Sequence, residues 1–596
     1  MTIGKTTDAG NLFFRRFFIR ILLVVAAAAF LLRLGVSWEM SQINGGLNNM
    51  LKPPQASDLH TYIRLGQEIT RGQWPKEFYY QPFYYAVFLP LIYLFTHFSL
   101  WAVAVIQSFL GGLTVFLTGL AGKELFGRTA GIIAAVFAAI STPLLLYAPF
   151  HQNETLQCFN LTLLFFLLLR ALRKKDHFSW GAVGVVAGIA TLTRGNILLF
   201  MPLLLLALWL ARGISRRQKL ISSAVLLALF LLVQLPFIIY NTRSRGLLTG
   251  PSTAADAVLA LGNTPEAPPG GRNAGLPAGP MEYPQSFHDF MALTSQGRSV
   301  PRQMLEWMCR EPGAFFELQF RKLLLFWDGR ELPNNVSLYG EGEYSNILKL
   351  LLPGRSHVLL SFALAGMFFF AGSLFNARMK KRSWLYCFII FYWGAIAVFY
   401  ILSRFRAPIL PLTAIFAGAF ISTVLFKWKK WERQKKALAL LALASGIFIT
   451  TGAYDHYADN LEPVLMRYCR PAGTLVKDGL LDNGPFTCGA WTPVDLQPGT
   501  RLAKHFAVSG KSGRIQWQIF SPEGWLIFKV NGREYSYKLS SQGSNIVTFD
   551  APSEFEIEII SAPEKCAAVF DRRRDYGRSS LNGETIPAEW VMRFTF

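Results

Sequence analysis

The stretch FFIRILLVVAAAAFLL, residues 17–32, contains one charged side chain and decides the class of fold. A helix rises about 1.5 Å per residue, so a run that continues to residue 38 is long enough to cross a hydrocarbon layer of about 30 Å. Comparable apolar runs recur along the 596-residue chain, which is 52% hydrophobic and has a mean hydropathy of +0.31. The basic residues before the first run also resemble a secretory signal. The run is longer than a signal core, which favours an uncleaved first membrane helix in a polytopic α-helical membrane protein.

Clusters of Lys and Arg separate the apolar runs, and such clusters are enriched in cytoplasmic loops. Placing every cluster inside puts the N-terminus in the cytoplasm and the C-terminal tail outside. The short run 82–95 is broken by two prolines, and we interpret it as a helix at the outer membrane surface. The eleven predicted spans are residues 17–38, 99–121, 129–149, 155–171, 178–193, 196–211, 220–240, 356–376, 383–402, 407–425 and 437–453.

The chain divides into a predicted membrane domain, residues 1–453, and a polar tail, residues 454–596. Two outer loops of the membrane domain are long, at about 39–98 and 241–355, and long loops in compact domains are usually functional. An amphipathic helix is expected at 301–326. The tail has short alternating strand patterns, and the pair Asn531-Gly532 is a strong hairpin signal. We predict an extracytoplasmic β-sandwich of jelly-roll type.

The net charge of +22 would suggest nucleic-acid binding in a soluble protein, but here it lies in the loops between apolar runs. We therefore expect no nucleic-acid partner. No Gly-rich phosphate-binding loop is present, which argues against a nucleotide-sugar donor or an ATP-driven pump.

If the tail is extracytoplasmic, one disulfide among its three cysteines is expected, with the pairing left open. These are Cys469, Cys488 and Cys566.

Two carboxylates stand out on the outer side. Asp58 follows two prolines and Ser57 at a predicted helix start, with Tyr62 one turn later on the same face. A helix cap and a catalytic role explain Asp58 equally well on these grounds. Glu154 lies in a very short loop between two apolar spans, where a charge is costly to dehydrate and is a functional candidate. The alternative for Glu154 is a surface side chain that reaches water.

Three arginines lie at outer helix breaks, against the usual preference of cations for the inner side. Arg194 is in LTRGN, residues 192–196, and Arg404 and Arg406 are in SRFRAP, residues 403–408. A guanidinium offers planar, paired donors to a phosphate group. Lipid headgroup contact or an ion pair would also explain these residues. Two carboxylates and several arginines on one side supply what sugar transfer from a lipid phosphate requires, namely a base and charge neutralisation for the leaving group.

The order of these motifs resembles the GT-C superfamily of membrane glycosyltransferases. It is most similar to the branch containing protein O-mannosyltransferases and the aminoarabinose transferase of lipid A. The likeness covers roughly residues 15–425. The matching pieces are Asp58 with Tyr62, Gly66 and Gly72; the run 81–85; Phe126-Gly127-Arg128; Glu154; Gly188 and residues 192–194; residues 235–241 with Gly262-Asn263; Pro312 to Trp327; and residues 404–411.

The resemblance implies a polyprenyl-phosphate sugar as donor, inversion at the sugar, and a glycan, lipid or protein as acceptor. It implies that Asp58 is the catalytic base with Glu154 nearby, and that the substrate contacts Arg194, Arg404, Arg406, Tyr62, Tyr84 and Asn263. The aminoarabinose transferase has an acidic residue in its first loop that is implicated in metal binding. Here Tyr80-Gln81-Pro82 offers none, so a divalent metal stays an open question. The Trp-Trp-Asp signature of oligosaccharyltransferases is absent.

Two other classes of protein are weighed against a transferase. A lipid-sugar flippase would need polar residues near the bilayer midplane, and the predicted spans contain few. A non-catalytic subunit of a glycan assembly machine would present the tail to carbohydrate and would not need Asp58. The basic inner loops suggest a bacterial inner membrane. The sequence leaves the sugar, the acceptor, the oligomeric state and the role of the tail open.

Overall fold

The computed structural model describes most of the chain, in two compact units. The first unit contains residues 1–256 and 326–452, and the second contains 257–325 and 453–596. The segment 257–325, which we expected in an outer loop of the membrane domain, groups with the tail; a domain boundary at residue 453 stays a prediction. The described residues are 4–42, 50–55, 57–265, 267–270, 283, 285–338, 340–351, 354–373, 381–457, 474–476, 479–481, 491–506, 512–539, 543–571, 579–586, 589–590 and 592–595.

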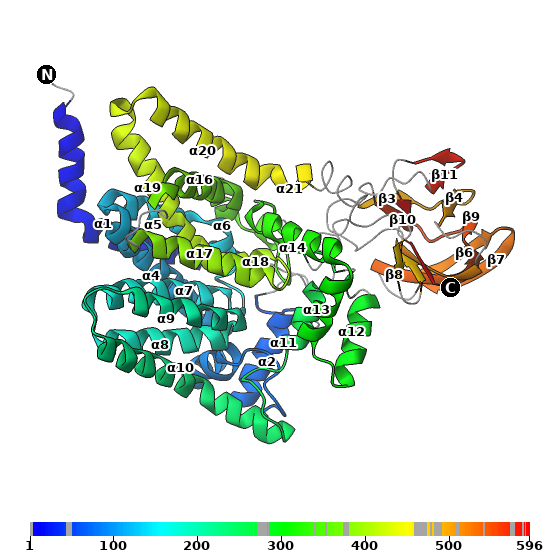
Figure 1. The fold of residues 1–596 in the computed structure, drawn as a ribbon, viewed down its shortest axis with the longest axis horizontal. Helices are drawn as coiled ribbons and strands as arrows, with labels where there is room; N and C mark the ends of the chain where they lie inside the picture. Colours follow the sequence, from blue (N-terminus) through cyan, green and yellow to red (C-terminus); the bar gives the residue numbers. More distant parts are fainter. Residues whose placement is uncertain are drawn as a thin grey trace. The chain divides into compact units, whose positions relative to one another are not determined.

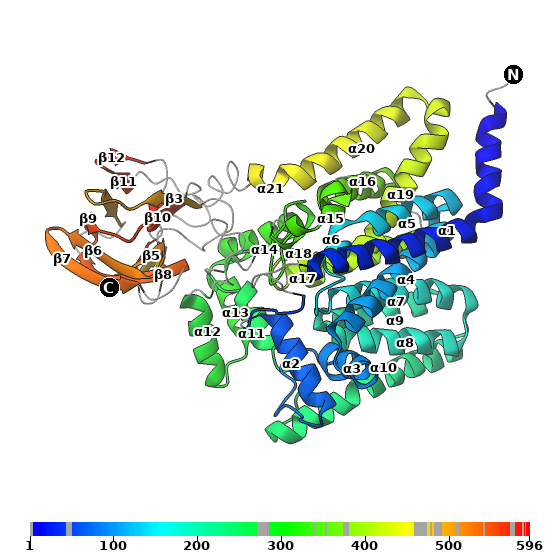
Figure 2. The same cartoon turned by 180° about the vertical axis from the view of Figure 1, so that it is seen from behind.

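The first unit is helical, and its long helices run side by side (Figures 1 and 2). The helices are α1 Gly4–Ser41, α2 Asp58–Thr70, η1 Phe83–Phe88, α3 Leu89–Thr96, α4 Leu100–Phe126, α5 Arg128–Ile140, α6 Thr142–Leu146, α7 Glu154–Lys174, α8 His177–Thr193, η2 Gly195–Phe200, α9 Met201–Leu210, α10 Arg216–Arg245, η3 Glu341–Tyr344, α15 Asn346–Leu350, α16 Ser356–Phe369, η5 Ala371–Ser373, α17 Lys381–Ala397, α18 Ser403–Arg406, η6 Ala407–Ile409, α19 Leu410–Lys427, η7 Trp428–Lys430 and α20 Arg433–Thr451.

Each of the eleven predicted spans contains helix. Among the described residues, five helices are long and apolar enough to cross a membrane: Phe17–Ser41, Leu100–Phe126, Glu154–Lys174, Arg216–Arg245 and Ser403–Lys430. Shorter apolar helices occupy Phe83–Thr96, Arg128–Ile140, His177–Thr193, Gly195–Leu210 and Ser356–Phe369. The predicted class, a polytopic helical membrane protein with a C-terminal β region, is confirmed. The number of crossings and their orientation stay predictions.

Small residues set the closest helix contacts in this unit. A Cβ placed on Gly131 of α5 would lie 2.4 Å from the carbonyl oxygen of Gly119 in α4. A Cβ on Gly418 of α19 would lie 2.4 Å from the carbonyl oxygen of Ala130 in α5. In lipid, helices associate through close packing rather than through the hydrophobic effect, so glycine at such crossings is stabilising. Helix α5 is therefore held tightly between α4 and α19.

The short apolar run after residue 82 folds as the π-helical η1 followed by α3. Its inner side buries Tyr84, Tyr85 and Leu89 in a cluster that includes Tyr62 of α2. Its outer side exposes Leu91 and other apolar side chains. The pair η1 and α3 thus supports α2, while its predicted place at the membrane surface stays a prediction.

The second unit has a helical part and a β part. The helices are α11 Ala255–Gly262, α12 Gln285–Ser295, α13 Val300–Arg310, α14 Pro312–Trp327 and α21 Ala453–His456, the first and fourth of which cross the boundary between the units. The single amphipathic helix expected at 301–326 is wrong, since α13 and α14 are separate. The residue before a proline is disfavoured in helical conformation, and Glu311 before Pro312 has φ −134° and ψ 64°.

The β part contains β1 Thr474–Val476, β2 Gly479–Leu481, β3 Trp491–Asp495, β4 Arg501–His505, β5 Ser512–Ser521, β6 Gly524–Val530, β7 Arg533–Leu539, β8 Gly543–Pro552, β9 Glu554–Ser561, β10 Ala567–Asp571, β11 Ser579–Leu581, β12 Glu584–Thr585, β13 Glu589–Trp590 and β14 Met592–Thr595. Among the described residues these form two antiparallel sheets. One has eight strands, with the order β1-β2-β14-β5-β10-β13, β8 beside β5 and β3 beside β10. The other has six, in the order β12-β11-β4-β9-β6-β7.

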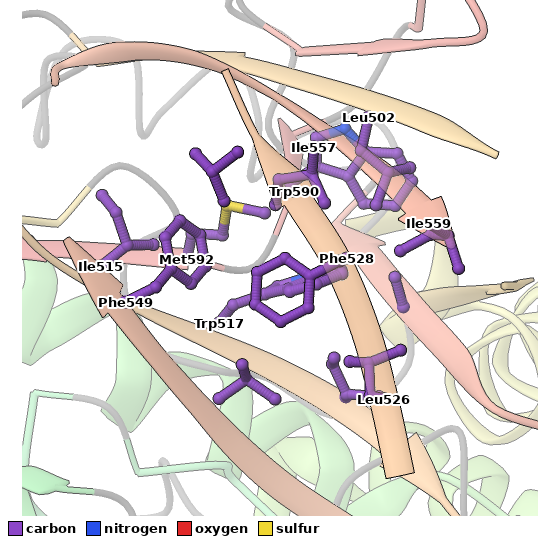
Figure 3. Close-up of a cluster of buried hydrophobic side chains, with 14 of the residues drawn as sticks. Leu502, Ile515, Trp517, Leu526, Phe528, Phe549, Ile557, Ile559, Trp590 and Met592 are labelled. Atoms are coloured by element: carbon purple, nitrogen blue, oxygen red, sulfur yellow. The ribbon is translucent and has the colours of Figure 1, made fainter. Parts of the chain in front are cut away.

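Both sheets contribute to one apolar core, which makes this part a sandwich. Figure 3 shows Trp517 of the first sheet and Phe528 of the second lying together, with their ring centroids 5.9 Å apart. The predicted hairpin is confirmed: Asn531 and Gly532 both have positive φ and join β6 to β7, as a type I′ turn requires. Cys566 is buried and carries no disulfide, while Cys469 and Cys488 lie outside the described residues.

Candidate functional site

Asp58 is the first residue of α2, and its carboxylate is not the helix cap. The cap is Ser57, whose hydroxyl accepts a hydrogen bond from the backbone N–H of His60 at 3.3 Å. Asp58 Oδ2 instead accepts from Arg404 Nη1 at 2.8 Å and from Asn335 Nδ2 at 2.8 Å. The side chain keeps 28% of its surface exposed. The carboxylate is therefore held in place and still reachable.

The surroundings of Asp58 keep its carboxyl group ionised. Burial acts to raise the pKa of Asp58, but the Arg404 charge, the hydrogen bonds from Asn335 and Arg404, and the charge of Arg194 outweigh it. The pKa of Asp58 is lowered as a result. At neutral pH this group is a carboxylate that can accept a proton.

Glu154 and Arg194 form a second carboxylate–guanidinium pair, at 2.9 Å between Oε1 and Nη2. Glu154 begins α7 and is fully buried, and 12% of the Arg194 side chain is exposed. Arg194 lies where α8 stops and η2 begins, with extended backbone angles. The break in the helix turns the guanidinium of Arg194 toward the start of α7.

The two ion pairs belong to one cluster. Arg194 Nη1 lies 3.5 Å from the backbone oxygen of Arg404. The guanidinium groups of Arg194 and Arg404 lie 4.4 Å and 5.2 Å from the ring centroid of Phe405. A cation over an aromatic face is stabilised by the ring quadrupole. The structure thus brings Asp58, Glu154, Arg194 and Arg404 together from four separate parts of the first unit.

Arg406 has different hydrogen-bond partners from Arg404. It is 2% exposed, and its guanidinium donates to the backbone oxygens of Phe326 at 3.2 Å, of Asp328, and of Arg330 at 3.0 Å. Donors engaged in this way hold the segment 326–330 against α18. These contacts set Arg406 apart from the cluster, and its role in binding substrate stays a prediction.

The tyrosines predicted to contact substrate, Tyr62 and Tyr84, belong to the apolar cluster formed by α2, η1 and α3. Tyr62 stacks on Tyr85, with ring centroids 6.0 Å apart, and burial followed by the Asp58 charge raises its pKa well above the ordinary value. The Tyr84 hydroxyl donates to Gln107 Oε1 at 2.8 Å. Both phenols are buried, and their role in binding substrate stays a prediction.

Asn263 lies in the second unit. Its Oδ1 accepts from Lys322 Nζ at 2.9 Å and from Gln319 Nε2 at 3.1 Å. Burial lowers the pKa of Lys322 well below its ordinary value. The role of Asn263 in binding substrate stays a prediction.

Two contributors to the cluster were not anticipated. Asn335, far from Asp58 in sequence, has a positive φ of 65° and donates to the Asp58 carboxylate. Asn tolerates this conformation better than most residues, so the Pro-Asn-Asn run at 333–335 is a turn signal that marks it. The sequence marks Phe405 only as part of a motif. In the structure the guanidinium groups of Arg194 and Arg404 both contact its ring.

The described residues do not fit a divalent cation. Among them no three His, Cys, Asp or Glu side chains gather closely enough to hold a metal ion. One oxygen of each carboxylate of the cluster is paired with a guanidinium, which already balances its charge. No step is therefore assigned to a metal.

Fold and site together define a helical membrane protein with a cluster of two carboxylates and two guanidinium groups. Residues 80–240 match the model of the dolichyl-phosphate-mannose-protein mannosyltransferase family. The match includes Glu154 and Arg194, and it confirms the resemblance to this branch of the GT-C superfamily. No protein with a curated description matches the chain.

Solved structures are similar at low identity. The apo oligosaccharyltransferase of Archaeoglobus fulgidus aligns with a TM-score of 0.43 and 16% identity, over 76% of this chain and 58% of that one. ArnT from Cupriavidus metallidurans, bound to undecaprenyl phosphate, aligns with a TM-score of 0.39 and 14% identity, over 76% of this chain and 66% of that one. The chain thus covers less than two thirds of either protein.

Proposed function

We propose that the protein transfers a monosaccharide from a polyprenyl-phosphate donor to an acceptor on the extracytoplasmic face of the membrane. The acceptor is a glycolipid, a polysaccharide or a protein. The proposal includes the N-terminus in the cytoplasm, the C-terminal β region outside and, for a bacterial source, residence in the inner membrane. It is supported by the family match over residues 80–240.

One observation carries the proposal: two guanidinium groups and an ionised, partly exposed carboxylate share one cluster. Arg194 and Arg404 both contact the Phe405 ring, and Arg404 is bonded to Asp58 at 2.8 Å. Two guanidinium groups offer several donors to the oxygens of a phosphate group. Their attachment to Asp58 and Glu154 keeps them in position before substrate arrives.

In the proposed reaction Asp58 accepts the proton of the acceptor hydroxyl or amine as the acceptor attacks the anomeric carbon. The new bond forms between the acceptor atom and this carbon, and the bond from the carbon to the phosphate oxygen breaks. The lipid phosphate leaves with the electron pair, and Arg194 and Arg404 stabilise its charge. A single displacement of this kind inverts the anomeric configuration. Glu154 keeps Arg194 turned toward the phosphate, as a positioning residue.

The test is Asp58→Asn, measured after the acceptor has been identified by mass spectrometry of the lipids and glycans that change when the gene is deleted. Asn preserves the shape and can still accept from Arg404, so the purified variant should keep its fold while its transfer rate falls about 10²–10⁴-fold. The control is Glu68→Gln on the same helix, which removes an exposed pair with Arg64 and should leave the rate unchanged. Full transfer by Asp58→Asn would remove Asp58 as the base.

A further inference from the structure

Helix α1 carries a buried arginine within its apolar stretch. Arg33 is 1% exposed, and its Nη1 and Nη2 donate to the backbone oxygens of Ala29 at 2.9 Å and Ala138 at 3.4 Å. Among the described residues none of its hydrogen-bond partners is a carboxylate, and its Nε has no partner. Arginine stays protonated in proteins, and a buried charge without a counter-ion is strongly unfavourable. A charged side chain of this kind in a membrane helix is a candidate functional site.

The Arg33 side chain borders a small cavity between α1, α4, α6 and α7. A Cβ on Gly111 of α4 would overlap the Arg33 guanidinium, so this glycine allows the side chain to lie against α4. The cavity has room for about one water-sized particle. The other polar side chains that line it are Thr114, Tyr147, Thr155 and Cys158.

The lining of this cavity favours a negative charge. Thr155 Oγ1 is buried and, like Arg33 Nε, has no hydrogen-bond partner. Thr155 is the second residue of α7, where the free backbone N–H groups of a first helical turn stabilise an anion. No Asp or Glu from the described part of the chain lines the cavity. Glu154 is not the counter-ion, because its Oε1 is bonded to Arg194 and its Oε2 has no hydrogen-bond partner.

We propose that this cavity binds a single halide ion, chloride under physiological conditions, between Arg33 Nε and the Thr155 hydroxyl. A monatomic anion fits a space for one water-sized particle, whereas a phosphate or carboxylate group is too large for it. The ion balances the charge of Arg33 and links α1 to the first turn of α7, which Glu154 begins. A halide site of this kind goes beyond the proposed transfer reaction and is independent of it.

The experiment follows thermal unfolding of the purified full chain in nanodiscs by tryptophan fluorescence. Sodium gluconate, whose anion is too large for the cavity, is replaced stepwise by sodium chloride at constant ionic strength. Chloride is expected to raise the Tm along a saturating curve, because a ligand that binds only the folded state stabilises it. Bromide should act in the same way. Equilibrium dialysis with radioactive chloride should show a single bound ion per chain.

Two variants assign the effect to this cavity. Thr155→Val keeps the shape of the side chain and removes its hydroxyl, so half-saturation should move to about tenfold higher chloride. Arg33→Met removes the charge and should abolish the saturable response. The matched control is Arg20→Met, which removes an exposed cation from the same helix and should keep the response.

The outcomes separate a halide site from its alternatives. A Tm and a dialysis result that do not respond to chloride would mean that water fills the cavity, and the proposed site would be wrong. A response that is unchanged in Thr155→Val and Arg33→Met, or that Arg20→Met also removes, would overturn the assignment to this cavity. If Arg33→Met fails to fold, the shift in Thr155→Val decides, because this variant preserves the volume of the side chain.

Discussion

Gly418→Ala should weaken both the fold and the reaction, because α19 has no room for a methyl group where it crosses α5. The added Cβ would lie 2.4 Å from the carbonyl oxygen of Ala130 and 2.6 Å from the backbone nitrogen of Ala134. Both neighbours are backbone atoms of α5, so neither can rotate aside. Ordinary contact begins at 3.4 Å, which means that the helices must separate locally by about 1 Å.

The expected change in the free energy of unfolding of Gly418→Ala is the sum of two opposing effects. Overpacking of this kind lowers the free energy of unfolding by about 1–3 kcal/mol, and the higher helix propensity of alanine returns up to about 1 kcal/mol. Helix α19 continues from α18 through η6, and α18 carries Arg404. A shift of about 1 Å at a group that positions substrate can reduce a rate by about 10²-fold, so transfer should fall by that order.

The control is Gly394→Ala in α17, where a Cβ would meet nothing within 4 Å. Unfolding in detergent, followed by tryptophan fluorescence, gives the stability of both variants, and transfer of the radiolabelled sugar gives the rate. Gly418→Ala should be less stable and slower, and Gly394→Ala should match or exceed the unmodified protein. Equal behaviour of the two variants would refute the packing argument. A stability loss without a rate loss would refute the link from α19 to Arg404.

Three further predictions concern the charged cluster and the β core. Asn335→Ala removes a hydrogen bond that lowers the pKa of Asp58, so this pKa should rise and the acid limb of the pH–rate profile should move to higher pH; an unmoved limb contradicts this. The stability that the lowered pKa provides is present above the unfolded pKa of Asp58 and is lost as pH falls through the folded value. Glu154→Ala leaves Arg194 without its carboxylate partner and should lower the free energy of unfolding by about 3–5 kcal/mol. In a double-mutant cycle, adding Arg194→Ala should restore part of this loss. Trp517→Ala should destabilise the sandwich by about 3–5 kcal/mol, and a thermal scan of the full chain that shows no change would argue against the observed core.

Helices, strands and one hairpin could be predicted from the sequence because each depends on local pattern. Apolar runs mark the helices of the first unit, and Asn531-Gly532 fixes the turn between β6 and β7. The break between α13 and α14 could also have been predicted, since the rule for the residue before Pro312 is local. The amphipathic pattern runs across this break and conceals it.

The composition of the cluster was only partly predictable. Asp58 and Arg194 stand at helix ends in apolar surroundings, where a charge is conspicuous. Asn335 was not found, because its contact with Asp58 spans 277 residues and no sequence pattern connects them. Arg404 and Arg406 looked equivalent, yet residues two apart on a helix point to nearly opposite sides. Only the fold shows which of them faces the carboxylate.

The pairing of both guanidinium groups with carboxylates has a consequence for turnover. In the resting cluster each guanidinium already has a carboxylate partner, so the four groups carry no net charge between them. Under the proposed reaction an arriving lipid phosphate binds guanidinium groups whose charge is already balanced, rather than filling an empty positive site. Its binding is thereby kept moderate, which allows the spent carrier to depart. A site built of unpaired arginines would hold the carrier longer and release it more slowly.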